Sequence, residues 1–143
     1  MAKQEAGGPN QVSLQFLSRG ENVAMARLLA AAMVAERDLT VADLDEIKVV
    51  VSEAVTNAII HGYQNQPNQL VEMKLELTEN KFIIRIHDDG VGIADIEQAM
   101  QPNYSTVSER MGLGFAFMTS FMDKVEVVSV PDQGTVVTLT KHL

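Results

Sequence analysis

The chain has 143 residues, of which 46% are hydrophobic, and it carries a formal net charge of −8. This length and apolar content fit one globular domain with its own core, and they exclude a pair of separate catalytic and regulatory domains. The negative charge argues against a protein that wraps nucleic acid, and the lack of cysteine excludes disulfides, thiolate metal sites and a cysteine nucleophile.

The beginning of the chain, residues 1–11, contains no apolar segment of the kind found in secretory signals. We expect these residues to form a flexible tail and residues 12–143 to form one domain. No apolar run approaches the length of a membrane span, and the absence of cysteine suits a reducing compartment. The composition therefore predicts a soluble, cytoplasmic protein.

Alternating apolar and polar residues predict a first strand over residues 12–17, and apolar residues at steps of three and four predict a helix over 21–36. Arg27 is a lone cation in the centre of this helix. Most such residues are solvated or lie along the helix surface. A docking role for Arg27 therefore depends on whether the rest of the chain implies a partner.

The strongest periodicity lies in residues 43–62, where apolar residues recur at steps of three and four. Thr40 is a suitable N-cap because Asp43 follows three residues later, and Gly62 is a suitable end. The pattern predicts a long helix that lays one apolar face on the core.

Beside that apolar face, Glu53, Asn57 and His61 follow one another at intervals of four and so lie on nearly one line. They form either a half-exposed polar flank or a carboxylate and an amide directed into a cleft. An asparagine inside a helix brings no structural advantage, because it is a mediocre helix former. The choice between these interpretations depends on the remaining motifs.

Two hairpins are expected, because residues 70–78 and 81–87 alternate apolar and polar, as do residues 125–130 and 135–140. Between the hairpins, a short helix near 95–100 is followed by a segment that we expect to form a mobile cover. Helices and antiparallel strands are mixed without regular βαβ alternation. The fold class predicted is therefore α+β, a two-layer sandwich with a mixed, mostly antiparallel sheet and helices on one face.

Asp88-Asp89-Gly90-Val91-Gly92 places a carboxylate at the end of a strand, where two glycines let the backbone pass close to a ligand. Such an aspartate can accept a hydrogen bond from an exocyclic amine such as that of adenine, although an ordinary Asp-Gly turn has the same sequence.

Gly112-Leu113-Gly114 is expected to open a helix that runs to Met122. A glycine-rich start exposes backbone amides, and a helix N-terminus suits phosphate, although the same pattern is also a flexible connection into a helix. Gly134-Thr135 in the last hairpin is common turn chemistry by itself.

The order and spacing of these motifs together resemble the GHKL ATP-binding superfamily. Glu53-x-x-x-Asn57, Asp88-x-Gly90-x-Gly92, Gly112-x-Gly114 and Gly134-Thr135 resemble its N, G1, G2 and threonine boxes. Within the superfamily, residues 50–63, 87–93 and 121–129 are similar to the anti-sigma-F factors of spore-forming bacteria, and the similarity extends from about Leu14 to Leu143.

The resemblance implies a Bergerat-type ATP-binding fold and an ATP-dependent serine-protein kinase. Such a protein binds and inhibits a sporulation sigma factor and phosphorylates a serine of the anti-anti-sigma factor. It implies a homodimer whose interface buries the outer side of residues near Leu14 and Phe16. It implies neither direct nucleic-acid binding nor a membrane partner.

The resemblance also assigns roles to residues of this chain. Asn57 would ligate Mg²⁺, which favours oxygen ligands, and Glu53 would be the general base that accepts the proton of an attacking serine hydroxyl. Asp88 and Gly90 would bind the nucleotide at the adenine. The remaining expected contacts are Gly92 and Thr135 near the base, Gly112, Leu113 and Gly114 at the phosphates, and Ser105 and Thr106 in the nucleotide lid.

One departure concerns the lid, where Val107 stands in place of a lysine that is frequent in the family, and Arg110 is a candidate to replace that cation. Arg27 matches a partner-contacting arginine of the family, which favours a docking role for it. The altered lid motivates an alternative, a nucleotide-gated module that sequesters its partner without significant kinase activity. A histidine-kinase ATP domain is disfavoured, because about a dozen residues precede the first strand and leave no room for a phosphoacceptor hairpin.

Overall fold

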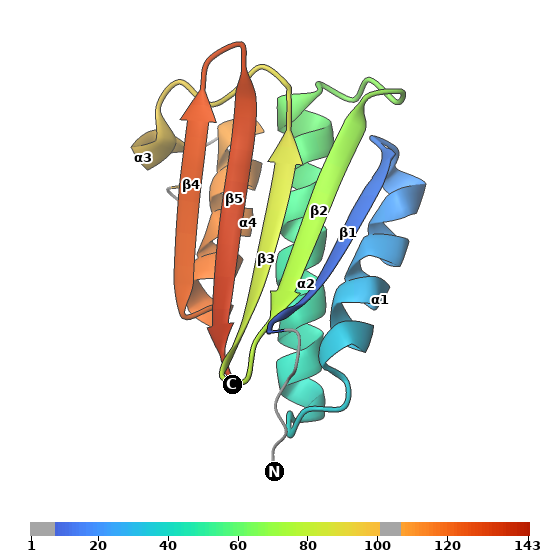
Figure 1. Ribbon diagram of the computed structural model, residues 1–143. Helices are drawn as coiled ribbons and strands as arrows, with labels where there is room; N and C mark the ends of the chain where they lie inside the picture. Colours follow the sequence, from blue (N-terminus) through green and yellow to red (C-terminus); the bar gives the residue numbers. More distant parts are fainter. Residues whose placement is uncertain (1–7, 101–106) are drawn as a thin grey trace.

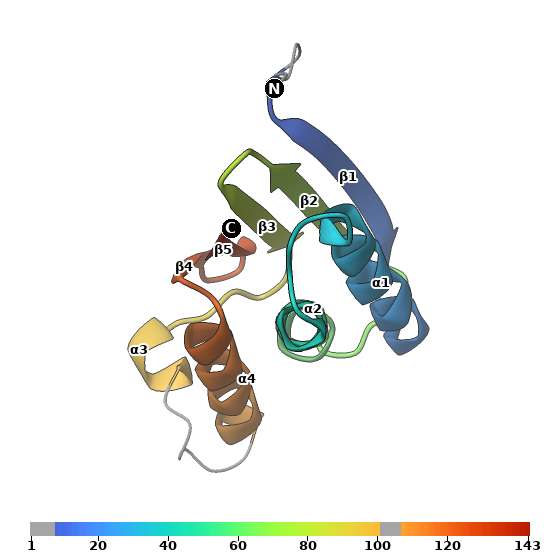
Figure 2. The same ribbon diagram turned by 90° about the horizontal axis from the view of Figure 1, so that it is seen from below.

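The computed structural model describes residues 8–100 and 107–143, without the side chains of residues 107–110. Its described strands form one five-stranded sheet in the order β1-β2-β3-β5-β4, and every pairing in it is antiparallel. The long helices all cover one face of this sheet (Figures 1 and 2). The predicted α+β, two-layer architecture is therefore confirmed.

The elements follow the expected order, with shifts of a few residues at their ends. Strand β1 begins at Asn10, two residues earlier than expected, and the long α4 begins five residues before Gly112. The bounds are β1 Asn10–Leu17, η1 Gly20–Asn22, α1 Val23–Val34, α2 Val41–Asn57, η2 Ala58–Gly62, β2 Leu70–Leu77, β3 Lys81–Asp88, α3 Ile96–Ala99, α4 Val107–Phe121, β4 Lys124–Val130 and β5 Gly134–His142.

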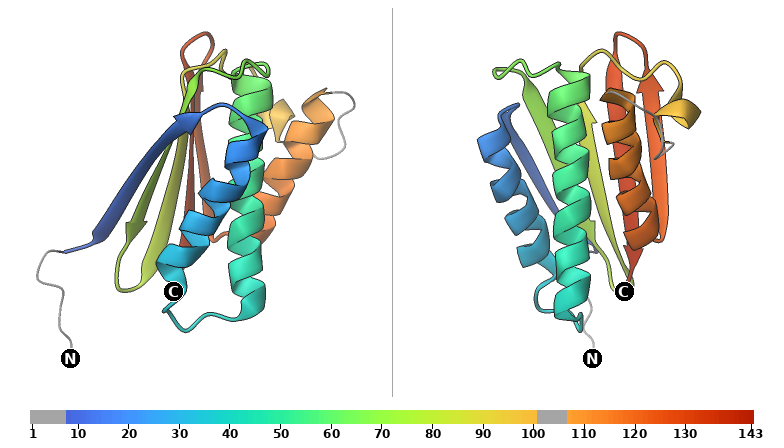
Figure 3. Two further views of the ribbon diagram at one scale, coloured as in Figure 1. Left: turned by 90° about the vertical axis from the view of Figure 1, so that its right-hand side faces the viewer. Right: turned by 180° about the vertical axis from the view of Figure 1, so that it is seen from behind.

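The core lies between the sheet and the helices, because alternate residues of each central strand point toward the helical layer. Helix α2 occupies the middle of that layer, between α1 and α4 (Figure 3). It buries the apolar face that the periodicity predicted. The fully buried members include Ile47, Val50, Val51 and Val55 from α2, and Met73, Phe82, Ile84 and Leu139 from the strands.

The start of α2 has the predicted capping box. Thr40 Oγ1 accepts a hydrogen bond from the Asp43 backbone N–H at 3.0 Å, and Asp43 Oδ2 accepts one from the Thr40 N–H at 3.0 Å. The Thr40 backbone and hydroxyl donors hold the pKa of Asp43 below its usual value. Two otherwise unpaired backbone groups are thereby satisfied, which sets where the helix begins.

The end of α2 differs from a regular helix. After Asn57 the chain makes one π-helical turn, Ala58–Gly62, before it leaves the helical layer. Turns of this kind occur mostly as single insertions and frequently lie at functional sites. This turn places Gly62 beside the end of β3, where the glycine-rich loop begins.

Leu14 and Phe16 of β1 face the helical layer rather than solvent. Phe16 is 6% exposed and belongs to the core, and Leu14 packs against that core. The outer side of β1 is formed by Gln11, Ser13 and Gln15, which are exposed. An interface on this strand would therefore bury polar residues, because the alternation of the strand turns its apolar side chains inward.

Candidate functional site

Glu53 and Asn57 lie one turn apart on the side of α2 that faces α4. A Cβ atom on Gly114 would come within 2.8 Å of Glu53 Oε1 and 3.5 Å of Asn57 Nδ2. A glycine at 114 therefore lets α4 pass directly beside these two polar side chains. They line one hollow together with Thr56, His61, Leu113 and Phe117.

The Asn57 side chain has an unmet hydrogen-bonding requirement. Its Nδ2 is buried and has no acceptor among the described residues. A buried amide without a partner costs about 1–3 kcal/mol, so its presence in a hollow favours a ligand that supplies the missing contacts. The amide oxygen of the same side chain is of the type that Mg²⁺ prefers, and phosphate oxygens would satisfy the amide nitrogen. Asn57 therefore fits a magnesium-bound phosphate group.

Asp88 ends β3 and is only 4% exposed. Burial raises the pKa of Asp88 from 3.8 to about 6, partly offset by the Gly90 N–H, which donates to Asp88 Oδ1 at 2.9 Å. The carboxylate is therefore ionised at neutral pH but poorly solvated. A buried acceptor of this kind suits a donor group on a ligand.

Three close backbone approaches surround Asp88, and each needs a glycine. A Cβ on Gly62 would lie 2.6 Å from Asp88 Oδ1, and one on Gly134 would lie 2.1 Å from the Asp88 carbonyl oxygen. A Cβ on Gly90 would lie 2.0 Å from the Gly62 carbonyl oxygen. That oxygen accepts a hydrogen bond from the Val91 N–H at 2.9 Å. The end of η2, the end of β3 and the start of β5 are thus packed closely together around Asp88.

Gly92 closes the same loop with a left-handed backbone, φ +76°. A Cβ there would lie 2.3 Å from the Val130 carbonyl oxygen at the end of β4. The two glycines of the predicted motif therefore allow close packing against the Gly62 and Val130 carbonyl groups. Whether they also border a nucleotide remains a prediction.

A pocket connects Asp88, Gly92, Thr135 and Asn57, which the sequence had grouped only by resemblance. Its cavity volume is about 20 Å³, which is room for roughly one water molecule. Met111 and Phe115 of α4 line this pocket, and its volume is smaller than a purine base needs. The other lining residues are Ala54, Ala58, His61, Gly62, Ile86, Ile93 and Val137.

The expectation that Gly112-Leu113-Gly114 opens a helix is wrong. Helix α4 begins at Val107, so these three residues lie in its interior. Backbone amides in a helix interior are already donated to the preceding turn, and the free amides belong to its first four residues. The reason is that the preceding residues continue the helical pattern, and the helix passes through glycines whose cost is only about 1 kcal/mol each.

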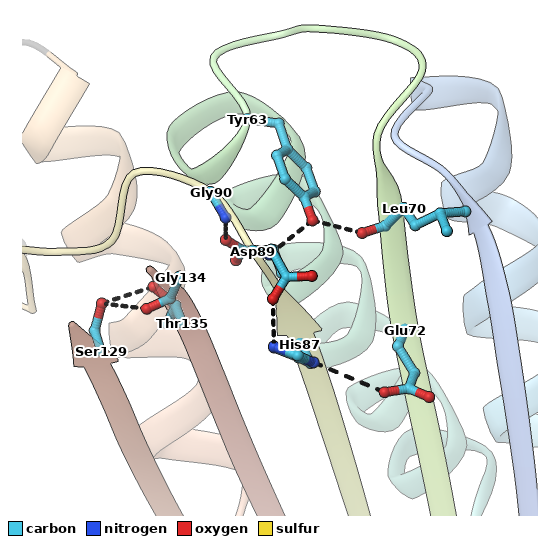
Figure 4. A network of polar contacts seen from close by, with 10 residues as sticks. Tyr63, Leu70, Glu72, His87, Asp89, Gly90, Ser129, Gly134 and Thr135 are labelled. Atoms are coloured by element: carbon cyan, nitrogen blue, oxygen red, sulfur yellow. Dashed lines mark hydrogen bonds and ion pairs between the residues drawn. The ribbon is translucent and has the colours of Figure 1, made fainter. Parts of the chain in front are cut away.

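Two hydroxyl groups that the sequence did not single out hold the loops around Asp88 (Figure 4). The Tyr63 hydroxyl donates to the Leu70 carbonyl at 2.6 Å and accepts from the Asp89 N–H at 2.7 Å. Ser129 Oγ accepts from the Ile93 N–H at 2.7 Å and donates to the Gly134 carbonyl at 3.1 Å. Both residues lie in stretches that resemble the family, but their partners are distant in sequence, so no local pattern indicated these contacts.

His87 lies between two carboxylates on the outer face of the sheet. Its Nε2 is 3.0 Å from Asp89 Oδ1 and its Nδ1 is 3.7 Å from Glu72 Oε1. The contacts tie β2 and β3 to the start of the glycine-rich loop. His87 therefore has a structural role.

Arg27 lies near Glu53, although the two come from different helices. Its Nη1 is 3.4 Å from Ser52 Oγ, and a second hollow is lined by Arg27, Lys48, Ser52 and Glu53, with Asp45 and Val49. Glu53 therefore borders two hollows, one with Asn57 and one with Arg27. Ser105 and Thr106 lie outside the described residues, as does the side chain of Arg110.

This arrangement has a definite chemical capacity. The Glu53 carboxylate borders two hollows, one suited to a magnesium phosphate and one that contains two cations. The buried acceptor Asp88 lines the adjoining pocket. A carboxylate placed like that of Glu53 can accept a proton from an incoming hydroxyl group.

No helix in the described part of the chain is both long and apolar enough to cross a bilayer.

The amino-acid sequence matches one protein-family model and several curated proteins. Residues 16–141 match the family model described as a histidine kinase-like ATPase domain. The chain is 48% identical to the anti-sigma F factor of Halalkalibacterium halodurans and 49% identical to that of Geobacillus kaustophilus, in each case over 94% of this chain and 93% of the relative.

Among solved structures, the RsbU and RsbW domains of a Mycobacterium tuberculosis protein superpose with a TM-score of 0.65 at 16% identity. The match covers 92% of this chain and 31% of that one. The histidine kinase domain of an Erythrobacter litoralis blue-light activated kinase superposes with a TM-score of 0.56 at 18% identity, over 85% of this chain and 59% of that one. At these identities the likeness shows the fold alone.

Proposed function

The chain belongs to the histidine kinase-like ATPase family, and from this membership we propose that it is an anti-sigma factor and an ATP-dependent serine-protein kinase. It binds and inhibits a sporulation sigma factor, and it phosphorylates a serine of the anti-anti-sigma factor that releases the sigma factor. The proposal includes a cytoplasmic location and a homodimer, as the resemblance implies.

The observation that carries the proposal is the position of Glu53 between two hollows. The hollow with Asn57 suits the nucleotide phosphates, and the hollow with Arg27 opens on the outer surface of α1 and α2. A serine hydroxyl that enters beside Arg27 meets the Glu53 carboxylate before it meets the phosphates. Glu53 accepts the hydroxyl proton while the oxygen attacks the terminal phosphorus, which is the role of the base in phosphoryl transfer.

ATP and Mg²⁺ fit the residues present. Asn57, whose amide lacks an acceptor among the described residues, would hold the metal, and Asp88 would hold the adenine amine. When bound, the metal supplies neutralisation of the charge that develops on the phosphate oxygens. The chain's own contribution is to place the base and the acceptor hydroxyl and to bury the adenine.

Nucleotide binding in this proposal includes a rearrangement of α4. The cavity that Met111 and Phe115 line is too small for a purine. Gly112 and Gly114 weaken the helix at this point by about 1 kcal/mol each, which lowers the cost of changing its conformation. Unwinding there would free the backbone amides of residues 112–114. In this proposal, those amides contact the phosphates only in the nucleotide-bound state.

Arg27 contributes to partner docking in this proposal. Its long hydrogen bond to Ser52 constrains it weakly, and Lys48 adds a second cation to the same hollow. Asp45 and Glu53 line the same hollow, so its side chains offer both signs of charge to a partner. The departure in the lid supports one alternative to the kinase function. In this alternative, the chain is a nucleotide-gated module that sequesters its partner without significant catalysis.

The test is transfer of labelled phosphate from ATP to the anti-anti-sigma factor by the wild type and by Glu53→Gln. Loss of the general base slows the transfer by roughly 10²–10⁴-fold. Calorimetric ADP binding stays unchanged, because the substitution keeps the size of the side chain. Glu46→Gln is the matched control, since it makes the same change on α2 outside both hollows, and it leaves transfer intact.

Two results would contradict the proposal. Equal transfer by wild type and Glu53→Gln would remove Glu53 from the mechanism. A wild type that binds ADP and the sigma factor but labels no partner would favour the sequestering module instead.

A further inference from the structure

Ser129 makes three polar contacts, and only one arrangement of hydrogens makes all three at once. Ser129 Oγ accepts from the Ile93 N–H at 2.7 Å. It is 3.1 Å from the Gly134 carbonyl oxygen and 2.8 Å from Thr135 Oγ1 (Figure 4). A serine hydroxyl has one hydrogen and two lone pairs. All three contacts are made together when Ser129 donates to the carbonyl and Thr135 donates to Ser129. Ser129 is then fully satisfied.

Thr135 consequently offers only lone pairs to the pocket. It is 7% exposed and lines the pocket together with Asp88. The two residues are direct partners across β3 and β5, so their side chains point to the same face of the sheet. At neutral pH, the polar groups of these two strand residues that meet in the pocket are therefore both acceptors.

Two neighbouring acceptors match one particular group on a purine. An exocyclic amine carries two N–H donors, so it can satisfy Asp88 and Thr135 together. A carbonyl oxygen in the same place would face these two acceptors and receive a hydrogen from neither. The acceptor pair therefore favours adenine over a base with a carbonyl at that position.

We propose that Ser129 is a positioning residue that holds Thr135 as an acceptor and thereby makes the site select adenine nucleotides over hypoxanthine and guanine nucleotides. The inference rests on the proposed nucleotide site and adds a determinant of base specificity to it. Ser129 acts through Thr135 and does not itself line the pocket.

The test compares the dissociation constants of ADP and IDP, which differ in the amine and the carbonyl and need no turnover. Ser129→Ala frees the Thr135 hydroxyl to rotate and donate to the carbonyl of IDP. The ratio of the IDP to the ADP dissociation constant should fall by about 5–10-fold, the equivalent of one hydrogen bond. Ser129→Thr keeps the hydroxyl and should keep the ratio, and Ser13→Ala, on the exposed side of β1, is the matched control.

A double-mutant cycle separates positioning from general destabilisation. Thr135→Val alone should lower the ratio as Ser129→Ala does, and adding Ser129→Ala to Thr135→Val should lower it no further. Thr135→Val also tests the acceptor pair by itself if Ser129→Ala does not fold. Equal weakening of ADP and IDP by Ser129→Ala, or additive losses in the double variant, would overturn the inference. A wild type that binds neither nucleotide would instead refute the proposed function.

Discussion

The two ends of the candidate site differ in how completely they are built. Around Asp88, three glycines, Tyr63 and Ser129 hold η2, β3 and β5 in close contact. At the α4 end, Gly112 and Gly114 lie inside a helix whose side chains line the pocket. The difference teaches that the strand end of the candidate site is tightly built, whereas the backbone amides of residues 112–114 are already donated within α4.

The largest expected effect comes from filling a backbone contact at the tightly built end. In Gly90→Ala the new Cβ would lie 2.0 Å from the Gly62 carbonyl oxygen, so the backbone must move. We expect a loss of about 3 kcal/mol in the free energy of unfolding, measured with urea, and no detectable ADP binding. Gly20→Ala is the control, because nothing lies within 4 Å of its new Cβ. Unchanged stability in Gly90→Ala would show that this end is not tightly built.

Asp88→Asn should separate stability from ligand affinity. Burial raises the pKa of Asp88 to about 6. The native state therefore holds the proton more tightly than the unfolded state, and this group's contribution to stability falls as pH rises from about 4 to 6. At pH 7.5 the variant, which cannot ionise, should unfold with a free energy about 1–2 kcal/mol higher than the wild type.

The same variant should bind ADP about 10–100-fold more weakly, since a hydrogen bond to a charged group is lost. Wild-type ADP affinity should increase as pH rises through 6, because binding needs the ionised carboxylate, and this pH dependence should vanish in Asp88→Asn. Calorimetry between pH 5 and pH 8 checks it. A wild-type affinity that does not vary with pH would mean that Asp88 does not contact the ligand.

Tyr63→Phe removes the hydroxyl that joins the Leu70 carbonyl to the Asp89 N–H. Two backbone groups lose their partner while the ring stays in the core. We expect a loss of about 1–3 kcal/mol in the free energy of unfolding and an ADP affinity several-fold lower, because Asp89 adjoins Asp88, the proposed adenine contact. Thermal unfolding and calorimetry measure the two effects. A stability loss with full ADP affinity would limit Tyr63 to a structural role.

The smallest expected effect tests the other end. Gly114→Ala stabilises the helical form of α4 by about 1 kcal/mol, so a rearrangement that unwinds this segment becomes harder, and ADP should bind about fivefold more weakly. The nearest atom to the new Cβ is Oε1 of the flexible Glu53 side chain, at 2.8 Å, and Asn57 Nδ2 follows at 3.5 Å. Ala32→Gly on the exposed side of α1 changes helix stability away from the site and should leave ADP affinity unchanged. Equal or tighter ADP binding by Gly114→Ala would contradict a rearrangement of α4.

Local patterns were sufficient where neighbours in the sequence determine the structure. The capping box at Thr40 and the apolar face of α2 were predicted because each depends on residues within one or two turns. The hairpin strands were predicted because alternation shows which side is buried. Glu53 and Asn57 were placed beside each other for the same reason, since residues four apart on a helix are neighbours.

Local patterns failed for Gly112 to Gly114. Glycine is a poor helix former, so the sequence suggested a helix start, but packing of α4 against α2 outweighs that preference of about 1 kcal/mol per glycine. On β1 the alternation predicted the strand correctly, and the dimer interface expected on its outer side stays a prediction.

The sequence by itself determined the order of the elements, the face of α2 that is buried and the family motifs, because these follow from short-range periodicity and spacing. Only the tertiary structure decided that Gly114 lies against Glu53, that Tyr63 holds the Asp89 backbone, and that the Ser129 and Thr135 hydroxyls meet. Such contacts join segments far apart in the chain. Their hydrogen-bond directions depend on which groups are buried together, and this is settled when the sheet and the helices pack.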